Sequence, residues 1–285
     1  MFRDSSKGAV GRISGLAWLV TVVVTTLAAC APLPPATSQS DGQAQTTAQL
    51  TVQSLPQAPA SHVAHPADGP LPVPANLIPL TQPAGQKRLM STAYNQSYWP
   101  LAQYFETQRN EAYCSMATSV MVLNALGIRR PESSLYPDFP FFTQQDFFHG
   151  IDAQVANAAQ VSKEGMTLDQ LDAALSAFPV EVTKFHADDL TLDRFRNLIR
   201  DTVVRHDRFA LLNFGRVQIG EAGGGHWSPL AAYDTASDSA LLLDVARYKY
   251  PAVWVPVAQL YAGAQAVDKV CRQSRGLVIV SRRVN

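Results

Sequence analysis

The sequence predicts an α+β fold from residue 80 onward, because segments with helical periodicity come first and short strand-like runs follow them. Helices and strands that are grouped, rather than alternating, indicate a helical N-terminal half and an antiparallel sheet in the C-terminal half. No stretch repeats another at a fixed period, so we expect residues 80–285 to form one domain.

The helical half contains one apolar helix and two further helices with clear start signals. The first is apolar on almost every side and ends near Gly127, which predicts a buried helix with that glycine at its C-terminal cap. Thr167 and Gln170 form a capping-box pattern at the start of the second, and Thr191 is the expected N-cap of the third. The predicted helices cover 115–127, 166–178 and 191–204.

The second half contains short apolar or β-branched runs bounded by Gly, Pro, Asp or Ser, as strands commonly are. These runs cover 208–214, 228–234, 240–246, 252–257 and 276–284. We expect them to form the sheet on which the helices pack.

The first 30 residues predict export. Basic residues near the start precede an apolar stretch, 15–29, that is too short for a comfortable membrane span but suits a signal peptide. It ends in Leu27-Ala28-Ala29-Cys30, which resembles the bacterial lipobox, so we expect 1–29 to be removed and Cys30 to carry lipid. The protein would then be a periplasmic, lipid-anchored membrane lipoprotein. The alternative is an ordinary signal peptide, with Cys30 incidental.

Residues 30–79 are rich in Pro, Ala, Gln, Ser and Thr. Such a segment has too little contiguous apolar surface to offset the entropy lost on ordering. We therefore expect a linker that joins the lipid anchor to the domain at 80–285.

Composition excludes several classes of protein. The 23 basic and 23 acidic residues give a net charge of zero, and no basic stripe or nucleic-acid-binding motif occurs, so nucleic acid is not an expected partner. The three cysteines are too few for a disulfide scaffold, and none forms a C-x-x-C metal pair. We expect no resident metal site.

Three residues carry the candidate chemistry. Cys114 directly precedes the predicted helix 115–127, where unpaired N–H groups favour a thiolate. His226 follows three glycines, and Asp244 ends an apolar strand, where a carboxylate can orient an imidazole. Taken singly, each also has a structural interpretation: a core cysteine, a strand-capping histidine and a turn aspartate. Together, in this chain order, they form the constellation of papain-like cysteine enzymes.

Three stretches closely resemble the catalytic domain of phytochelatin synthases: FETQRNEAYCSMATSVMVLNALGI, GGGHWSPLAAYD and LLLDVARYKYPAVWVPV. The resemblance implies a papain-like fold with Cys114 as nucleophile, His226 as general base and acid, and Asp244 as the residue that orients the histidine. It also implies that the Gln108 side chain contributes to an oxyanion hole. Arg247 stands at a family-typical arginine, for which pairing with a substrate carboxylate and a structural ion pair are both open.

The resemblance implies a glutathione γ-glutamylcysteinyltransferase that cleaves the Cys–Gly bond of glutathione through a γ-Glu-Cys acyl-enzyme. The acceptor would be water or a second glutathione. No tightly bound cofactor is implied, although cadmium or zinc thiolates of glutathione are expected as substrate or activator, which would link the enzyme to metal detoxification. Two alternatives stay open: a papain-like peptidase or amidase acting on other small peptides, and a lipoprotein that binds peptides without catalysis.

Overall fold

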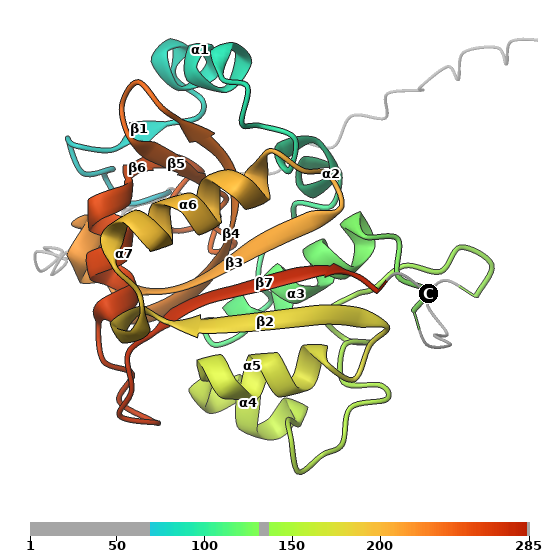
Figure 1. Ribbon diagram of the computed structural model, residues 1–285. Helices are drawn as coiled ribbons and strands as arrows, with labels where there is room; N and C mark the ends of the chain where they lie inside the picture. The colour runs from blue at the N-terminus through green and yellow to red at the C-terminus, as the bar shows by residue number, and fades with distance from the viewer. Residues whose placement is uncertain (1–68, 131–136, 284–285) are drawn as a thin grey trace, which may run out of the picture. The chain divides into compact units, whose positions relative to one another are not determined.

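The computed structural model describes residues 69–130 and 137–283, and these contain one seven-stranded sheet in the order β1-β6-β5-β4-β3-β7-β2 (Figure 1). Every neighbouring pair of strands is antiparallel. The strands are β1 (Ile78–Pro79), β2 (Val180–His186), β3 (Arg208–Gly215), β4 (Gly225–Asp234), β5 (Ser239–Leu242), β6 (Val253–Pro256) and β7 (Gly276–Arg282). The predicted α+β class with an antiparallel sheet is confirmed.

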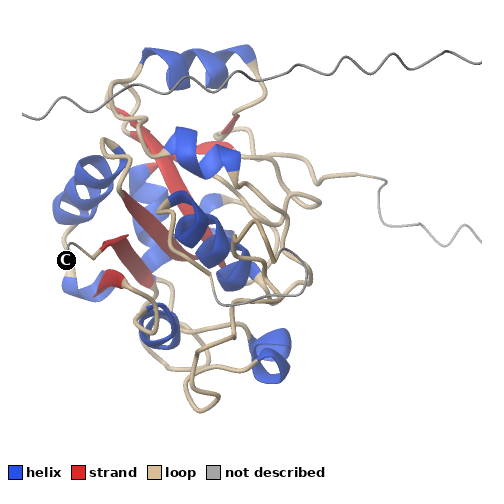
Figure 2. Ribbon diagram, turned by 90° about the vertical axis from the view of Figure 1, so that its right-hand side faces the viewer, coloured by secondary structure: helices blue, strands red, loops and turns tan. Residues whose placement is uncertain are grey.

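Helices cover both faces of this sheet, as Figure 2 shows by the strands lying between them. α3 and α5 lie over one face, and α6 and α7 pack on the other side of β3. The helices are α1 (Pro83–Ser91), α2 (Tyr98–Gln103), α3 (Cys114–Ala125), α4 (Ala158–Glu164), α5 (Leu168–Leu175), α6 (Leu192–Val203) and α7 (Val257–Gln265), with 3₁₀ turns η1 (Ala187–Asp189) and η2 (Arg216–Ile219).

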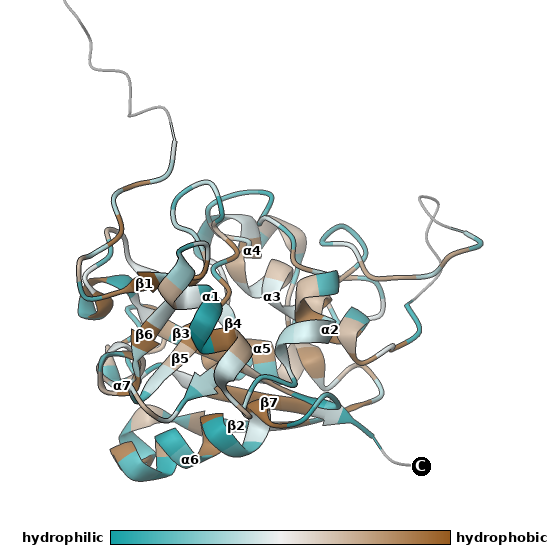
Figure 3. Ribbon diagram, turned by 90° about the horizontal axis from the view of Figure 1, so that it is seen from above, coloured by the Kyte–Doolittle hydropathy of each residue, from teal (hydrophilic) through white to brown (hydrophobic). Residues whose placement is uncertain are grey.

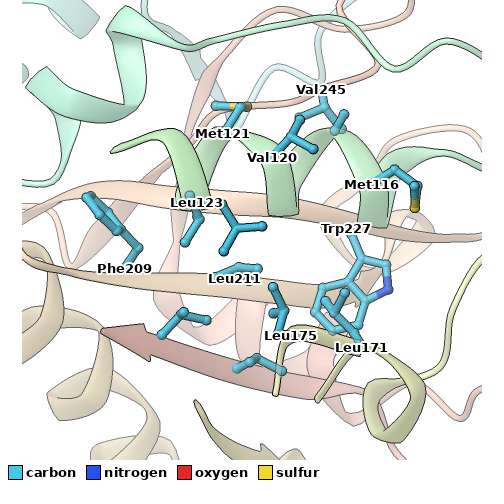
Figure 4. Close-up of a cluster of buried hydrophobic side chains, with 14 of the residues drawn as sticks. Met116, Val120, Met121, Leu123, Leu171, Leu175, Phe209, Leu211, Trp227 and Val245 are labelled. Atoms are coloured by element: carbon cyan, nitrogen blue, oxygen red, sulfur yellow. The ribbon is translucent and has the colours of Figure 1, made fainter. Parts of the chain in front are cut away.

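Each face of the sheet has its own hydrophobic core. Along β3, Phe209 and Leu211 point to the side of α3 and α5, whereas Ala210 and Leu212 join the core under α6 and α7. Because side chains alternate along a strand, a strand covered on both faces is apolar throughout. That explains why the predicted strands read as continuous apolar runs. Figure 4 shows the first of these cores, where side chains of α3, α5 and the sheet meet.

α3 is the buried helix expected at 115–127, and its end follows from one residue. Gly127 adopts a left-handed φ of 62°, its N–H bonds to the carbonyl of Asn124, and the N–H of Ile128 bonds to the carbonyl of Leu123. This is the Schellman arrangement that a glycine after a helix commonly makes. The predicted cap is confirmed, and α3 begins at Cys114 itself.

The other two predicted helices also begin as expected. Thr167 caps α5 in a complete capping box with Gln170, and the Thr191 side chain accepts from the backbone N–H of Arg194 at the start of α6. α6 carries both hydrophilic and hydrophobic residues (Figure 3), and its buried residues Phe195, Ile199 and Val203 recur four positions apart, as an amphipathic surface helix requires.

The division into a helical half and a strand half is incomplete. β2 lies between α5 and α6 in the chain and pairs with β7 at one edge of the sheet, while α7 follows β6 directly. The sequence does not predict four of the helices: α1, α2, α4 and α7.

The described part of the chain begins inside the segment assigned by composition to the linker. Leu77 is buried, and β1 pairs with β6, so this end of 30–79 packs against the domain. The predictions for 1–29 and for Cys30 lie outside the described residues. Within 69–130 and 137–283, no helix combines the length and hydropathy needed to span a bilayer.

Candidate active site

Cys114 is the first residue of α3, and its side chain is buried. The imidazole of His226 and the backbone N–H groups of Trp227 and Ser115 all act to stabilise the Cys114 thiolate. Burial opposes ionisation, but these donors outweigh it and lower the pKa of the Cys114 thiol below its ordinary value. The position at the helix N-terminus acts in the same direction.

Trp227 holds β4 against α3 beside the cysteine. Its indole N–H donates to the carbonyl of Met166 at 2.9 Å, and its ring lies in the core with Met116 and Leu171 (Figure 4). The anchored indole fixes the start of β4, where His226 is located.

His226 bridges the cysteine and the aspartate. Its Nε2 lies 2.8 Å from Oδ1 of Asp244, which leaves Nδ1 for Cys114, and Phe214 packs edge-on against the ring. Burial disfavours the imidazolium, but the charge of Asp244 and its hydrogen bond raise the pKa of His226 above its ordinary value. A raised pKa on the histidine and a lowered pKa on the thiol together favour a thiolate–imidazolium pair.

Asp244 lies just beyond the end of β5 and is fully buried. Its Oδ1 also accepts from the backbone N–H of Ala246 at 2.8 Å, which fixes the carboxylate toward His226. Although burial opposes ionisation, His226 and Arg216 hold the pKa of Asp244 well below its usual range. The carboxylate is therefore charged throughout the neutral range.

Arg216 and Glu221 are two further charged residues that sequence reasoning missed. The Arg216 guanidinium grips Asp244 at 2.7 and 3.0 Å, and it also forms an ion pair with Glu221. The only hint in the sequence is their position between β3 and His226, where nothing distinguishes a buried pair from a surface pair. Their role becomes visible only once the fold places η2 beside Asp244.

Gln108 lies in the loop before α3, and its backbone N–H bonds to the carbonyl of Val245, next to Asp244. Its side-chain Nε2 donates to the carbonyl of Asn110 at 2.8 Å and to the Tyr248 hydroxyl at 3.0 Å. Its buried Oε1 has no hydrogen-bond partner among the described residues. The fold thus brings Gln108 to the neighbourhood of Asp244, with its amide N–H groups engaged within the protein.

Arg247 is exposed and stacks on Phe105, with its guanidinium 4.8 Å from the ring centroid. Its Nη1 also lies 3.4 Å from the Phe105 carbonyl. Among the described residues, the lining of the cavity at Cys114 does not include Arg247.

A cavity of about 780 Å³ opens over Cys114 and His226. Its size falls within the range of small-molecule binding sites. Arg275 and Asp268 line it as a pair 2.9 Å apart, and Arg275 also donates to the Asn213 side chain at 2.7 Å. A Cβ on Gly225 would lie 2.3 Å from the Arg275 guanidinium, so glycine beside the histidine is what lets this cation approach. Lining residues of both signs suit a small zwitterionic ligand.

Comparison with known proteins identifies the family. Residues 69–277 match the family model of phytochelatin synthase. The chain belongs to the phytochelatin synthase family. The resemblance seen in the three sequence blocks is thereby confirmed.

Relatives carry the name glutathione gamma-glutamylcysteinyltransferase. Protein 1 of Lotus japonicus is 31% identical over 189 residues, which are 66% of this chain and 36% of the relative. Protein 1 of Triticum aestivum is 31% identical over 205 residues, 69% of this chain and 39% of the relative. The Schizosaccharomyces pombe protein is 26% identical over 193 residues, 68% and 45% of the two chains. The chain thus spans less than half the length of these curated relatives.

The part of the phytochelatin synthase domain that the structure describes shows no cluster of metal-ligating residues. No group of three or more His, Cys, Asp or Glu residues there is arranged to hold a metal ion. The cavity is lined by Cys114 and His226, a thiol and an imidazole of the kind that cysteine-dependent acyl transfer uses.

Proposed function

We propose that this chain is a glutathione γ-glutamylcysteinyltransferase-like enzyme that cleaves the Cys–Gly bond of glutathione and passes γ-Glu-Cys to water or to a second glutathione. The observation that carries the proposal is that His226 acts on the Cys114 thiol and bonds to Asp244 at 2.8 Å, beside a cavity that Cys114 and His226 line. The substrate class comes from the relatives, which are named for glutathione.

In the proposed reaction, the Cys114 thiolate attacks the carbonyl carbon of the Cys–Gly bond. The His226 imidazolium donates its proton to the departing glycine nitrogen, which leaves a γ-Glu-Cys thioester on Cys114. Water or the α-amino group of a second glutathione then attacks the thioester, and His226 removes the proton from the attacking group. Cys114 leaves as a thiolate, which restores the thiolate–imidazolium pair, while Asp244 holds the imidazole throughout.

The developing oxyanion needs donors. We assign the backbone N–H of Cys114, at the start of α3, and the amide of Gln108 to this task. Gln108 would have to release one of its two internal acceptors, the Asn110 carbonyl or the Tyr248 hydroxyl, as substrate enters. The exposed Tyr248 is the easier of the two to displace.

Recognition of the γ-glutamyl group requires a cation for its carboxylate and an anion for its ammonium group. Arg275 and Asp268 offer both within the cavity. Arg247 remains a second candidate for a substrate carboxylate, provided that it leaves Phe105.

We also propose that the domain has a papain-like fold. This proposal is supported by a buried helix that begins at the cysteine and packs on an antiparallel strand whose second residue is the histidine.

Glycine release from glutathione tests the function. The protein should release glycine in a Cys114-dependent manner, and a Cys114→Ala variant should not. Cleavage of unrelated dipeptides without glycine release from glutathione would instead indicate a general peptidase, and binding without cleavage would indicate a binding protein. Product masses with and without cadmium would identify the acceptor and show whether metal thiolates serve as substrate.

For the N-terminal region we propose a signal peptide at 1–29, a lipid-anchored linker from Cys30 and a catalytic domain that begins before residue 80, because Leu77 and β1 pack against it, with export to the periplasm. Radiolabelled palmitate should be incorporated by the full chain and not by a Cys30→Ala variant. Equal labelling of both would contradict the lipid anchor.

A further inference from the structure

A buried carboxylate outside the proposed triad lies beside it. Glu221 follows η2, its side chain is fully buried, and its Oε2 pairs with Arg216. Its Oε1 has no hydrogen-bond partner within the described part of the chain. Buried polar atoms in proteins are nearly always hydrogen-bonded. A buried carboxylate with one oxygen unpaired therefore calls for an explanation other than its hydrogen bonds.

The explanation begins with Arg216, which lies between two carboxylates. Its Nη1 contacts both Glu221 and Asp244, and its guanidinium lies 5.9 Å from the ring centroid of Phe214 and 5.4 Å from that of Tyr250. The two rings and the two carboxylates fix the guanidinium, which in turn grips Asp244 through two hydrogen bonds. Arg216 therefore holds Asp244 rigidly.

The two hydrogen bonds from Arg216 to Asp244 have an electrostatic cost. Arg216 is permanently charged, so with Asp244 alone it would form a neutral pair, and a neutral pair stabilises an imidazolium poorly. The charge of Arg216 indeed lowers the pKa of His226, against the effect of Asp244. When ionised, Glu221 adds a second negative charge at the same nitrogen of Arg216, which leaves the three-residue group with one net negative charge beside His226.

We propose that Glu221 is a positioning residue that neutralises Arg216, so that Arg216 can hold Asp244 in place without cancelling the charge that stabilises the His226 imidazolium. The inference rests on the proposed role of His226 as acid and base. It does not depend on which substrate is cleaved.

The ionisation of Glu221 agrees with this role. Burial raises its pKa to about 7, with Arg216 opposing the rise and Asp244 adding to it. Arg216, Asp244 and His226 are the charged groups that act on Glu221, and Lys249 approaches the same loop near Gly223. Glu221 is consequently charged above about pH 7. This is the range in which an imidazolium with a raised pKa loses its proton.

The test measures the imidazolium without any substrate. Iodoacetate is anionic and is attracted by the imidazolium, whereas iodoacetamide is neutral, so the ratio of their alkylation rates at Cys114 falls as His226 loses its proton. Mass spectrometry of the peptide that contains Cys114 separates this reaction from that of Cys271. Glu221→Gln keeps an acceptor oxygen for Arg216 and removes only the charge. Glu221→Asp keeps the charge, and Glu181→Gln removes an exposed carboxylate on β2 as a matched control.

In Glu221→Gln, the pH midpoint at which the ratio falls should move down by about one unit, which means about tenfold fewer imidazolium-bearing sites at a given alkaline pH. Glu221→Asp and Glu181→Gln should keep the midpoint of the parent protein. A Glu221→Gln midpoint equal to that of the parent would overturn the proposal, even if thermal unfolding shows lower stability, because a purely structural role would change stability alone.

The design covers two further outcomes. If Glu221→Gln does not fold, Glu221→Asp decides: a parent-like midpoint supports the proposal, and a midpoint lowered by a full unit overturns it. Failure of the proposed function would be seen separately, as absence of glycine release from glutathione, and would leave the alkylation ratio interpretable.

Discussion

Replacing Asp244 by Asn removes the charge on which the thiolate–imidazolium pair depends. The carboxylate is fully buried, contacts Nε2 of His226 at 2.8 Å and is gripped by Arg216. With about 4 Å between charge centres and an effective dielectric constant of about 20, its attraction for the imidazolium is about 4 kcal/mol. Loss of most of that energy should reduce kcat for glycine release about 10³-fold.

The same substitution should change the ionisation of Cys114 in a defined direction. Without the charge of Asp244 the imidazolium is less stable, so the proton stays on the sulfur at neutral pH. The rate of alkylation by iodoacetamide should then rise only toward the pH of an ordinary thiol, about 8.5. The parent protein should react well below that pH, because its thiol pKa is lowered.

A surface variant provides the control. Asp238 forms a partly exposed ion pair with Arg196 and has a left-handed φ of 45°, which Asn tolerates well. Asp238→Asn should therefore keep both the turnover and the alkylation profile. An Asp244→Asn protein that is folded, turns over within tenfold of the parent and is alkylated at the parent's pH would refute the electrostatic reasoning.

Three other substitutions have defined expectations. Gln108→Ala should lower kcat about 10²-fold or more with little change in KM, because one oxyanion donor is lost; an unchanged kcat would remove Gln108 from that role. Gly127→Ala should destabilise the fold by about 1–2 kcal/mol in urea unfolding, since its φ is 62° and a Cβ there would lie 2.7 Å from the Arg282 guanidinium. Thr167→Ala should cost about 1 kcal/mol through loss of the capping box; an unchanged midpoint in either titration would contradict the structural reason given.

The positions that sequence could predict are those with a local signal. Thr167 and Gln170 cap α5 through contacts only three residues apart, and Gly127 ends α3 through its own backbone conformation. Cys114 was predictable for the same reason, since a helix N-terminus is a local feature. Its meeting with His226 and Asp244 is not local, and it was expected from the order of the three residues and from family resemblance.

What the sequence did not predict depends on the tertiary structure. β2 carries Glu181 and Lys184 among its apolar residues because it is the edge strand of the sheet, and so it lacks the continuous apolar pattern of β3. α7 follows β6 directly, and its N-cap residue is Pro256, which has no polar side chain that would indicate the start of a helix. Nothing in the sequence distinguishes Arg216 from a surface arginine, because its ion pairs with Glu221 and Asp244 form only in the folded protein.

The most direct test of the account is to trap the acyl-enzyme. The protein should be mixed with glutathione, quenched in acid within the first turnover and examined by mass spectrometry for γ-Glu-Cys attached through a thioester. We predict the adduct on Cys114 at a yield that matches the glycine released in the burst, and its absence in Cys114→Ala. Glycine release without an adduct on Cys114, or undiminished release by Cys114→Ala, would contradict a cysteine nucleophile at the start of α3.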